Sequence, residues 1–177
     1  MVYVELASRG VLGFVMAFAV IGKVAGRERW RGFQASLGGL GWIPRGWWPV
    51  VAPLVVLAEA GVVALLLIPA TAAVGLASGG LLLLGMSVAV LVARRAGREV
   101  RCHCFGSDAG PIGRASLARN ALLVLVCGAG LATSIASTAL PGPAAGGIVL
   151  GLAGLAATAL AHPGELAFVL ASLARRS

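Results

Sequence analysis

The sequence has few charged residues for its length. Only 11% of its 177 residues are charged, whereas ordinary soluble domains carry about 25%. Hydrophobic residues make up 59% of the chain, and its mean hydropathy is +0.98. A soluble chain of this length could not bury so much apolar surface in one core. The composition therefore excludes an ordinary soluble domain and indicates an integral membrane protein.

Several catalytic and binding signatures are also absent. The sequence has no arrangement typical of Ser/His/Asp catalysis, no phosphate-binding loop and no dinucleotide fingerprint. It also shows no inverted repeat, a feature that is common in secondary transporters. The net charge of +8 would suit a nucleic-acid binder, but the basic residues stand in blocks between apolar runs. That distribution is typical of membrane topology, so we expect a lipid bilayer as partner and no nucleic acid.

Five apolar segments are long enough to cross a bilayer as helices. They cover about residues 4–22, 50–68, 71–93, 116–137 and 144–161. The first has no purely basic start and no clear cleavage site, so we expect a retained span rather than a signal peptide. The predicted fold class is an all-α integral membrane protein. We expect a four-helix transmembrane bundle over residues 1–137, and an additional apolar segment with a short basic tail over residues 138–177.

The C-terminal apolar segment allows two interpretations. The chain is apolar almost throughout from Ala144 to Ala174, and one helix of that length would be about 46 Å long, more than one span requires. His-Pro-Gly at 162–164 interrupts it. We expect either a fifth span followed by a short interfacial helix, or one strongly bent helix. Gly147 and Gly151 form a GxxxG step, which we interpret as tight packing within the chain rather than as a dimer contact.

Basic residues alternate between the connections. They cluster after the first apolar segment, after the third and at the C-terminus, whereas the short connections near Pro69 and Pro141 have none. The positive-inside rule then predicts a bacterial plasma membrane protein with its N-terminus outside and its basic loops in the cytoplasm. All four tryptophans fall in the first basic loop, where we expect an aromatic belt at the membrane surface. They are Trp30, Trp42, Trp47 and Trp48.

The most unusual stretch is Arg101-Cys102-His103-Cys104, in the second basic loop. Two cysteines one residue apart would close a strained disulfide, and strained, exposed disulfides are labile and oxidising. Arg101 and His103 would favour the thiolate, which attacks disulfides. The stretch is therefore a redox-active pair, a soft metal site with His103 as a third ligand and no visible fourth, or a reduced pair without a role. Cys127 is either a small buried hydrophobe or a resolving thiol.

Ionisable residues inside apolar segments are costly and usually paired or functional. Arg9 lies in the first segment and Glu59 in the second, and the helical rise predicts an Arg9–Glu59 pair facing the bundle interior. Lys23 shares the face of Arg9 at the cytoplasmic edge. Arg119-Asn120 opens the fourth segment, and Asn120 there needs a hydrogen-bond partner. These residues predict an intramembrane polar site, which is either a polar path or a site for an anionic headgroup or a quinone. The alternative is a structural ion pair.

The chain resembles the MauE family, membrane proteins of methylamine utilisation within the wider DoxX-like group. The resemblance covers about residues 5–135, and its specific part is the Cys-x-Cys-Phe-Gly block. The residues that carry it are Arg9, Gly22-Lys23, Ile43-Pro44, Glu59, Cys102-His103-Cys104-Phe105-Gly106 and Arg119-Asn120. It implies a four-helix membrane core and a role in maturing methylamine dehydrogenase, whose small subunit carries disulfides and a cofactor made from tryptophan side chains. It also implies a thioredoxin-like partner.

Three functional hypotheses follow. The first is a thiol–disulfide redox component that assists the maturation of a partner enzyme, with Cys102 and Cys104 cycling and with a quinone as the one cofactor considered. The second is a non-enzymatic scaffold or anchor for a thioredoxin-like partner, so enzymatic activity stays open. The third is a small transporter that uses the Arg9–Glu59 pair. Disulfide formation belongs outside the cytoplasm, whereas the charge rule places Cys102 and Cys104 inside.

Overall fold

The computed structural model describes residues 2–98, 114–136 and 143–161. In these ranges the chain is helical, without any strand. The α-helices are α1 (Val2–Val24), α2 (Arg27–Leu40), α3 (Trp48–Leu67), α4 (Ala72–Arg95), α5 (Arg114–Ala136) and α6 (Pro143–Ala161). Two single 3₁₀ turns, η1 (Arg45–Trp47) and η2 (Pro69–Thr71), precede α3 and α4. The prediction of an all-α membrane bundle is confirmed.

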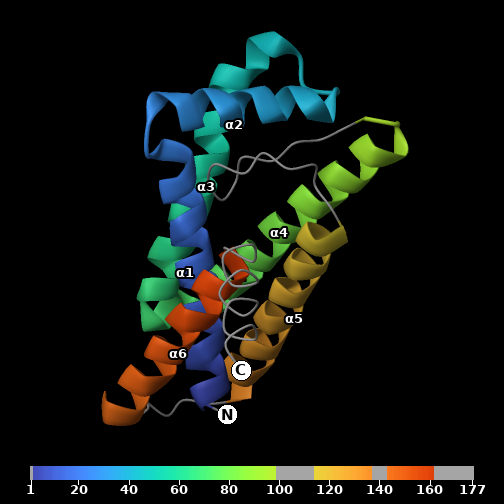
Figure 1. The fold of residues 1–177 in the computed structure, drawn as a ribbon. Coiled ribbons are helices and arrows are strands. Elements are labelled where there is room, and N and C mark those ends of the chain that lie inside the picture. The colour runs from blue at the N-terminus through green and yellow to red at the C-terminus, as the bar shows by residue number, and fades with distance from the viewer. Residues whose placement is uncertain (1, 99–113, 137–142, 162–177) are drawn as a thin grey trace, which may run out of the picture.

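The helices form a bundle with one helix across its end (Figure 1). α1 contacts α3, α5 and α6, while α4 packs between α3 and α5. Four helical stretches of the described chain are long and apolar enough to cross a membrane: Val2–Val24, Arg45–Leu67, Pro69–Arg95 and Leu117–Ser134. The fifth predicted segment is α6, whose apolar part, Ala145–Leu160, is shorter. Its packing along α1 makes α6 part of the bundle.

α2 was not predicted, because it lies in the first basic loop. It runs across one end of the bundle, where it contacts α1, α3 and α4, and α3 begins beyond it (Figure 1). Phe33 and Leu37 are buried against the first half of α3, with Trp30 and Leu40 packed beside them. These four side chains recur at intervals of three, four and three residues, which is one face of an amphipathic helix. A helix of this kind is suited to the plane of a membrane surface.

The bundle core is an apolar cluster in which glycines allow close helix contact. It contains Leu12, Val15, Met16, Val62, Leu66, Leu76, Leu83, Leu123, Cys127 and Ala157. A Cβ placed on Gly10 of α1 would lie 2.8 Å from the Cβ of Ala153 on α6. A Cβ on Gly79 of α4 would lie 2.7 Å from Cδ2 of Leu12. Small residues at helix crossings are the usual means of tight association in lipid.

The GxxxG step on α6 faces away from this core. Gly147 and Gly151 are both exposed, and among the described residues nothing lies within 4 Å of a Cβ built on either one. The interpretation of this step as packing within the chain is therefore wrong for the described part of the molecule. The glycines of α6 that do contact α1 include Gly154, whose Cβ would meet the ring of Phe14 at 3.4 Å.

Two sequence predictions fall outside the described ranges. The proposed division of the chain at residue 137 lies in the connection between α5 and α6. The choice between an interfacial helix and a bent helix concerns residues 162–177. Both stay predictions.

Candidate functional site

A buried ion pair joins α1 and α3 at the end covered by α2. Lys23 is the second-last residue of α1, and its Nζ donates to Oε1 and Oε2 of Glu59 on α3, at 2.5 and 2.6 Å. The two side chains are 0% and 2% exposed. A cation suits the C-terminal end of a helix, because the helix dipole is negative there. A charge buried at this depth is tolerated only with an opposite charge beside it.

Phe33 of α2 covers the ion pair. The Lys23 ammonium lies 5.2 Å from the centroid of the Phe33 ring, a distance at which the ring face attracts a cation. Phe33 is itself 2% exposed and packs with Leu37 and Ala52 in a second apolar cluster. The ring of Trp30 lies 6.1 Å from it, in a tilted arrangement. α2 therefore shields the ion pair from water.

The predicted Arg9–Glu59 pair is not formed. Helix counting placed the first residues of α3 level with the last residues of α1, and so placed Glu59 closer to Arg9. The structure shows that α3 starts beyond α2 (Figure 1), with Ala52 packed against α2. Glu59 is therefore level with Lys23, which takes the place predicted for Arg9.

The two intramembrane arginines bind the carboxyl ends of neighbouring helices instead. Arg9 donates to the carbonyl oxygen of Leu66, the second-last residue of α3, from Nη2 at 2.8 Å and Nε at 3.2 Å. Its Nη1 also lies 3.9 Å from Oε1 of Glu5. Arg119 on α5 donates from Nη1 to the carbonyl oxygen of Leu160 in the last turn of α6, at 3.4 Å. The last carbonyls of a helix lack partners within it, so both contacts stabilise a helix end.

Asn120 finds a partner on α4. Its Nδ2 donates to Oγ of Ser87 at 3.1 Å, and Ser87 in turn donates to the carbonyl oxygen of Leu83 at 2.7 Å. Ser87 is therefore the hydrogen-bond partner that Asn120 was expected to need. Of the five residues predicted to form one intramembrane polar site, the structure brings Lys23 and Glu59 into contact. The hydrogen bonds of the other three reach different helices.

The predicted redox stretch, Arg101, Cys102, His103 and Cys104, lies outside the described residues. The chain that leads to it is described as far as Arg98, three residues beyond the end of α4, and α4 contacts α2.

Cys127 is buried in the bundle core, where its side chain is 4% exposed. It is a free cysteine and packs near Gly80 of α4, whose Cβ would lie 3.5 Å from that of Cys127. This surrounding agrees with its interpretation as a small hydrophobic residue. Within the described ranges no group of three His, Cys, Asp or Glu side chains could hold a metal ion.

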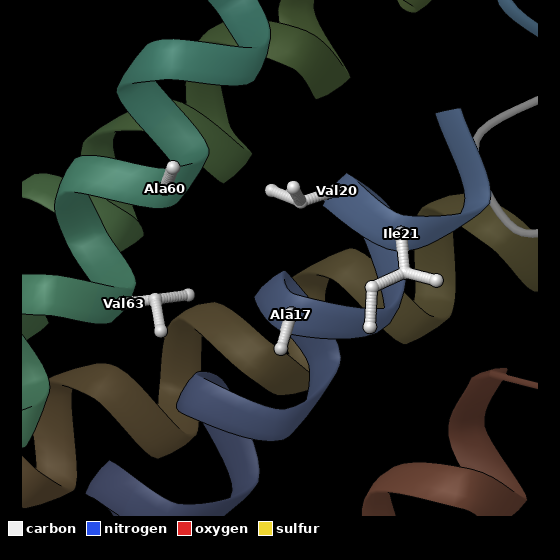
Figure 2. A pocket seen from close by; sticks show the side chains of 5 residues that line it. All are labelled: Ala17, Val20, Ile21, Ala60 and Val63. Carbon is white, nitrogen blue, oxygen red and sulfur yellow. The ribbon is translucent and has the colours of Figure 1, made fainter. Parts of the chain in front are cut away.

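An apolar groove runs between α1 and α3 on the outside of the bundle (Figure 2). Its lining residues are Ala17, Val20 and Ile21 of α1 with Ala60 and Val63 of α3, and its volume is about 180 Å³. Val20 lies three residues before Lys23, and Ala60 directly follows Glu59. The groove is therefore adjacent along both helices to the buried ion pair, but it is lined by alkyl groups.

Long apolar helices, a buried ion pair and a basic helix across one end define a multi-pass helical membrane protein. The chain belongs to the family of the methylamine utilisation protein MauE, whose sequence model matches residues 1–133. The match ends within α5 and leaves out α6, and it confirms the resemblance to MauE noted in the sequence. Membership of the wider DoxX-like group stays a prediction. No curated protein and no solved structure matches the chain.

Proposed function

We propose that this MauE-family protein is a thiol–disulfide redox component of the bacterial plasma membrane that assists the maturation of a partner enzyme. Cys102 and Cys104 are the redox pair, and Arg101 and His103 favour the thiolate. The family description, a protein of methylamine utilisation, supports this class of function. A pair of cysteines one residue apart supports it chemically, because the disulfide would be strained and easily reduced.

The observation that carries the proposal is the match to the MauE family model over residues 1–133, a range that includes Cys102 and Cys104. The described residues add a surface for a partner. α4, which precedes the cysteine segment in the chain, contacts α2. α2 carries exposed arginines and is followed by Trp42, which is 52% exposed. We propose this aromatic and basic surface as the docking site of the partner.

The chemistry is a two-electron exchange. When the pair oxidises its partner, two thiols of the partner become a disulfide and release two electrons and two protons. The Cys102–Cys104 disulfide accepts these and becomes two thiols. A thioredoxin-like protein is the partner class that we propose. A lipid-soluble quinone is the acceptor that would return the pair to the disulfide by taking up the same electrons and protons. The positive-inside rule favours a cytoplasmic position for the pair, with cytoplasmic thiols as the electron source.

The test is the redox state of the two cysteines in intact membranes, measured by thiol alkylation and mass shift. The Cys127→Ser variant leaves the two loop cysteines as the only thiols of the chain. We expect a mixed population that reductant converts fully to the alkylated form. A reagent that cannot cross the membrane, used in parallel, shows which side the pair faces. A pair that stays reduced after mild oxidation would exclude the redox role.

A non-enzymatic anchor for a thioredoxin-like protein is the second candidate. It is favoured by the full burial of Lys23 and Glu59 against each other, which suits a structural role for the pair. It is also favoured by Trp42 and Trp47, which are exposed in the connection between α2 and α3. The two candidates differ in one result. A Cys102→Ser, Cys104→Ser double variant would still support partner maturation if the chain is an anchor. The transporter hypothesis relied on the Arg9–Glu59 pair, which is not formed.

A further inference from the structure

The groove between α1 and α3 is open to the membrane and has no polar lining. The side chains of Ala17, Val20 and Ile21 line one side of it and those of Ala60 and Val63 line the other (Figure 2). Ile21 is 56% exposed, so the groove lies on the lipid-facing surface. An empty groove would lose dispersion contacts along both walls. A flexible hydrocarbon chain is the occupant that the bilayer supplies.

A cluster of basic residues follows the groove along the chain. Ile21 lies six residues before Arg27, where α2 begins. Arg27, Arg29 and Arg31 are all exposed, and Glu28 is the one acidic residue of α2. The charge of this helix is therefore positive, at the level where the apolar surface of α1 ends. A headgroup at that level meets arginines, while the chain below it meets alkyl groups.

We propose that the groove binds one acyl chain of an anionic phospholipid whose phosphate is held by the first-turn arginines of α2. Charge complementarity selects this occupant, because basic residues next to transmembrane helices bind anionic headgroups. A zwitterionic lipid of the same chain length fills the groove equally well but gains less from Arg27 and Arg29. This site is separate from the proposed thiol chemistry and does not depend on it.

The experiment is a lipid titration of the full-length protein in detergent, followed by native mass spectrometry. Phosphatidylglycerol and phosphatidylcholine with identical chains are the two probes. We expect phosphatidylglycerol to bind about thirtyfold more tightly, the effect of two arginines at a charged headgroup. Arg27→Gln with Arg29→Gln reduces its affinity to that of phosphatidylcholine. Ala60→Phe fills the groove and weakens both lipids.

Matched variants separate this site from general effects. Arg94→Gln with Arg95→Gln removes two exposed arginines at the end of α4, and Ala58→Phe adds a ring at an exposed position of α3 that does not line the groove. Both leave lipid binding unchanged if the site is as proposed. Equal affinity for the two lipids, or an equal loss in the Arg94/Arg95 variant, would overturn the role of the α2 arginines. A photo-cross-linker at position 60 that labels the protein itself instead of lipid would overturn the acyl chain as occupant.

Discussion

The bundle core and the end covered by α2 (the α2 end) differ in the chemistry of their buried side chains. The bundle core consists of apolar side chains and glycines, with helices close enough that the Cβ of an alanine at position 10 would lie 2.8 Å from that of Ala153. The α2 end holds a charged pair, Lys23 and Glu59, under the aromatic ring of Phe33. Close helix packing stabilises the bundle core, whereas an ion pair covered by Phe33 stabilises the α2 end.

The difference follows from the solvent of each region. In lipid, helices gain little by burying apolar surface, so close approach through small residues is what stabilises the bundle core. At the α2 end two charges are removed from water, and they are stable there because they bind each other and α2 excludes solvent. Variants in the two regions should therefore differ in how much stability they lose and in how many helices the loss affects.

The largest expected effect comes from breaking the ion pair. Glu59→Gln leaves the Lys23 ammonium buried without its counter-charge, which should cost about 3–5 kcal/mol. Thermal unfolding in mild detergent would measure it. Replacing both residues, as Lys23→Met with Glu59→Leu, keeps the volume and removes both charges, so most of the stability should return. A double variant as unstable as the single one would contradict this account of the α2 end.

Removal of the cover should have a large but local effect. Phe33→Ala deletes a buried ring and should cost about 3–5 kcal/mol, mainly in the docking of α2. Hydrogen exchange should then become faster in α2 and stay slow in α4, because regions of a protein can open separately. Trp42→Ala, at an exposed position of the same region, is the control and should change little. Uniformly faster exchange in both helices would show that the two regions open together.

A smaller effect is expected from one methyl group in the bundle core. Gly10→Ala places a Cβ against that of Ala153, and neither atom can move without its backbone. α1 and α6 must separate, at a cost of about 1–3 kcal/mol. Gly85→Ala is the control, because no described atom lies within 4 Å of its Cβ. Thermal unfolding should show that Gly10→Ala is less stable than Gly85→Ala. Equal stability of the two variants would argue against close α1–α6 packing.

The smallest effect is expected for the hydrogen bond between α4 and α5. Ser87→Ala removes the acceptor of the Asn120 amide, and hydrogen bonds between membrane helices are worth about 0.6 kcal/mol on average. Thr133→Ala is the control, since Thr133 Oγ1 bonds to carbonyls of its own helix. A double-mutant cycle with Asn120→Leu would measure the coupling. A coupling as large as that of Lys23 with Glu59 would remove the contrast between the two regions.

The spans could be predicted from the sequence, because the length of an apolar run is a local property. The predicted segments 50–68 and 71–93 correspond to α3, Trp48–Leu67, and α4, Ala72–Arg95. α2 was missed although its signal was present in the spacing of Trp30, Phe33, Leu37 and Leu40. The arginines and glycines of this segment are typical of a loop, and the segment was therefore predicted to be a basic loop.

The site was predicted in its residue types but not in its pairing. Glu59 was singled out as an ionisable residue inside an apolar segment and Lys23 as one at the edge of an apolar segment, and both are buried. Their contact was missed because the counting of turns assumed that α3 starts at the level where α1 ends. The prediction of a redox pair at Cys102 and Cys104 rests on the sequence and the family, because both residues lie outside the described ranges.

The sequence by itself determined the class of protein, the spans and the residues whose burial needs a partner, because hydrophobicity and charge belong to each segment alone. Only the tertiary structure decided that Glu59 binds Lys23, that Arg9 binds the end of α3, and that α2 closes over the ion pair. These choices depend on how far each helix is shifted along its neighbour and how it is rotated. Shift and rotation are set by the packing of all the helices together, which no single segment encodes.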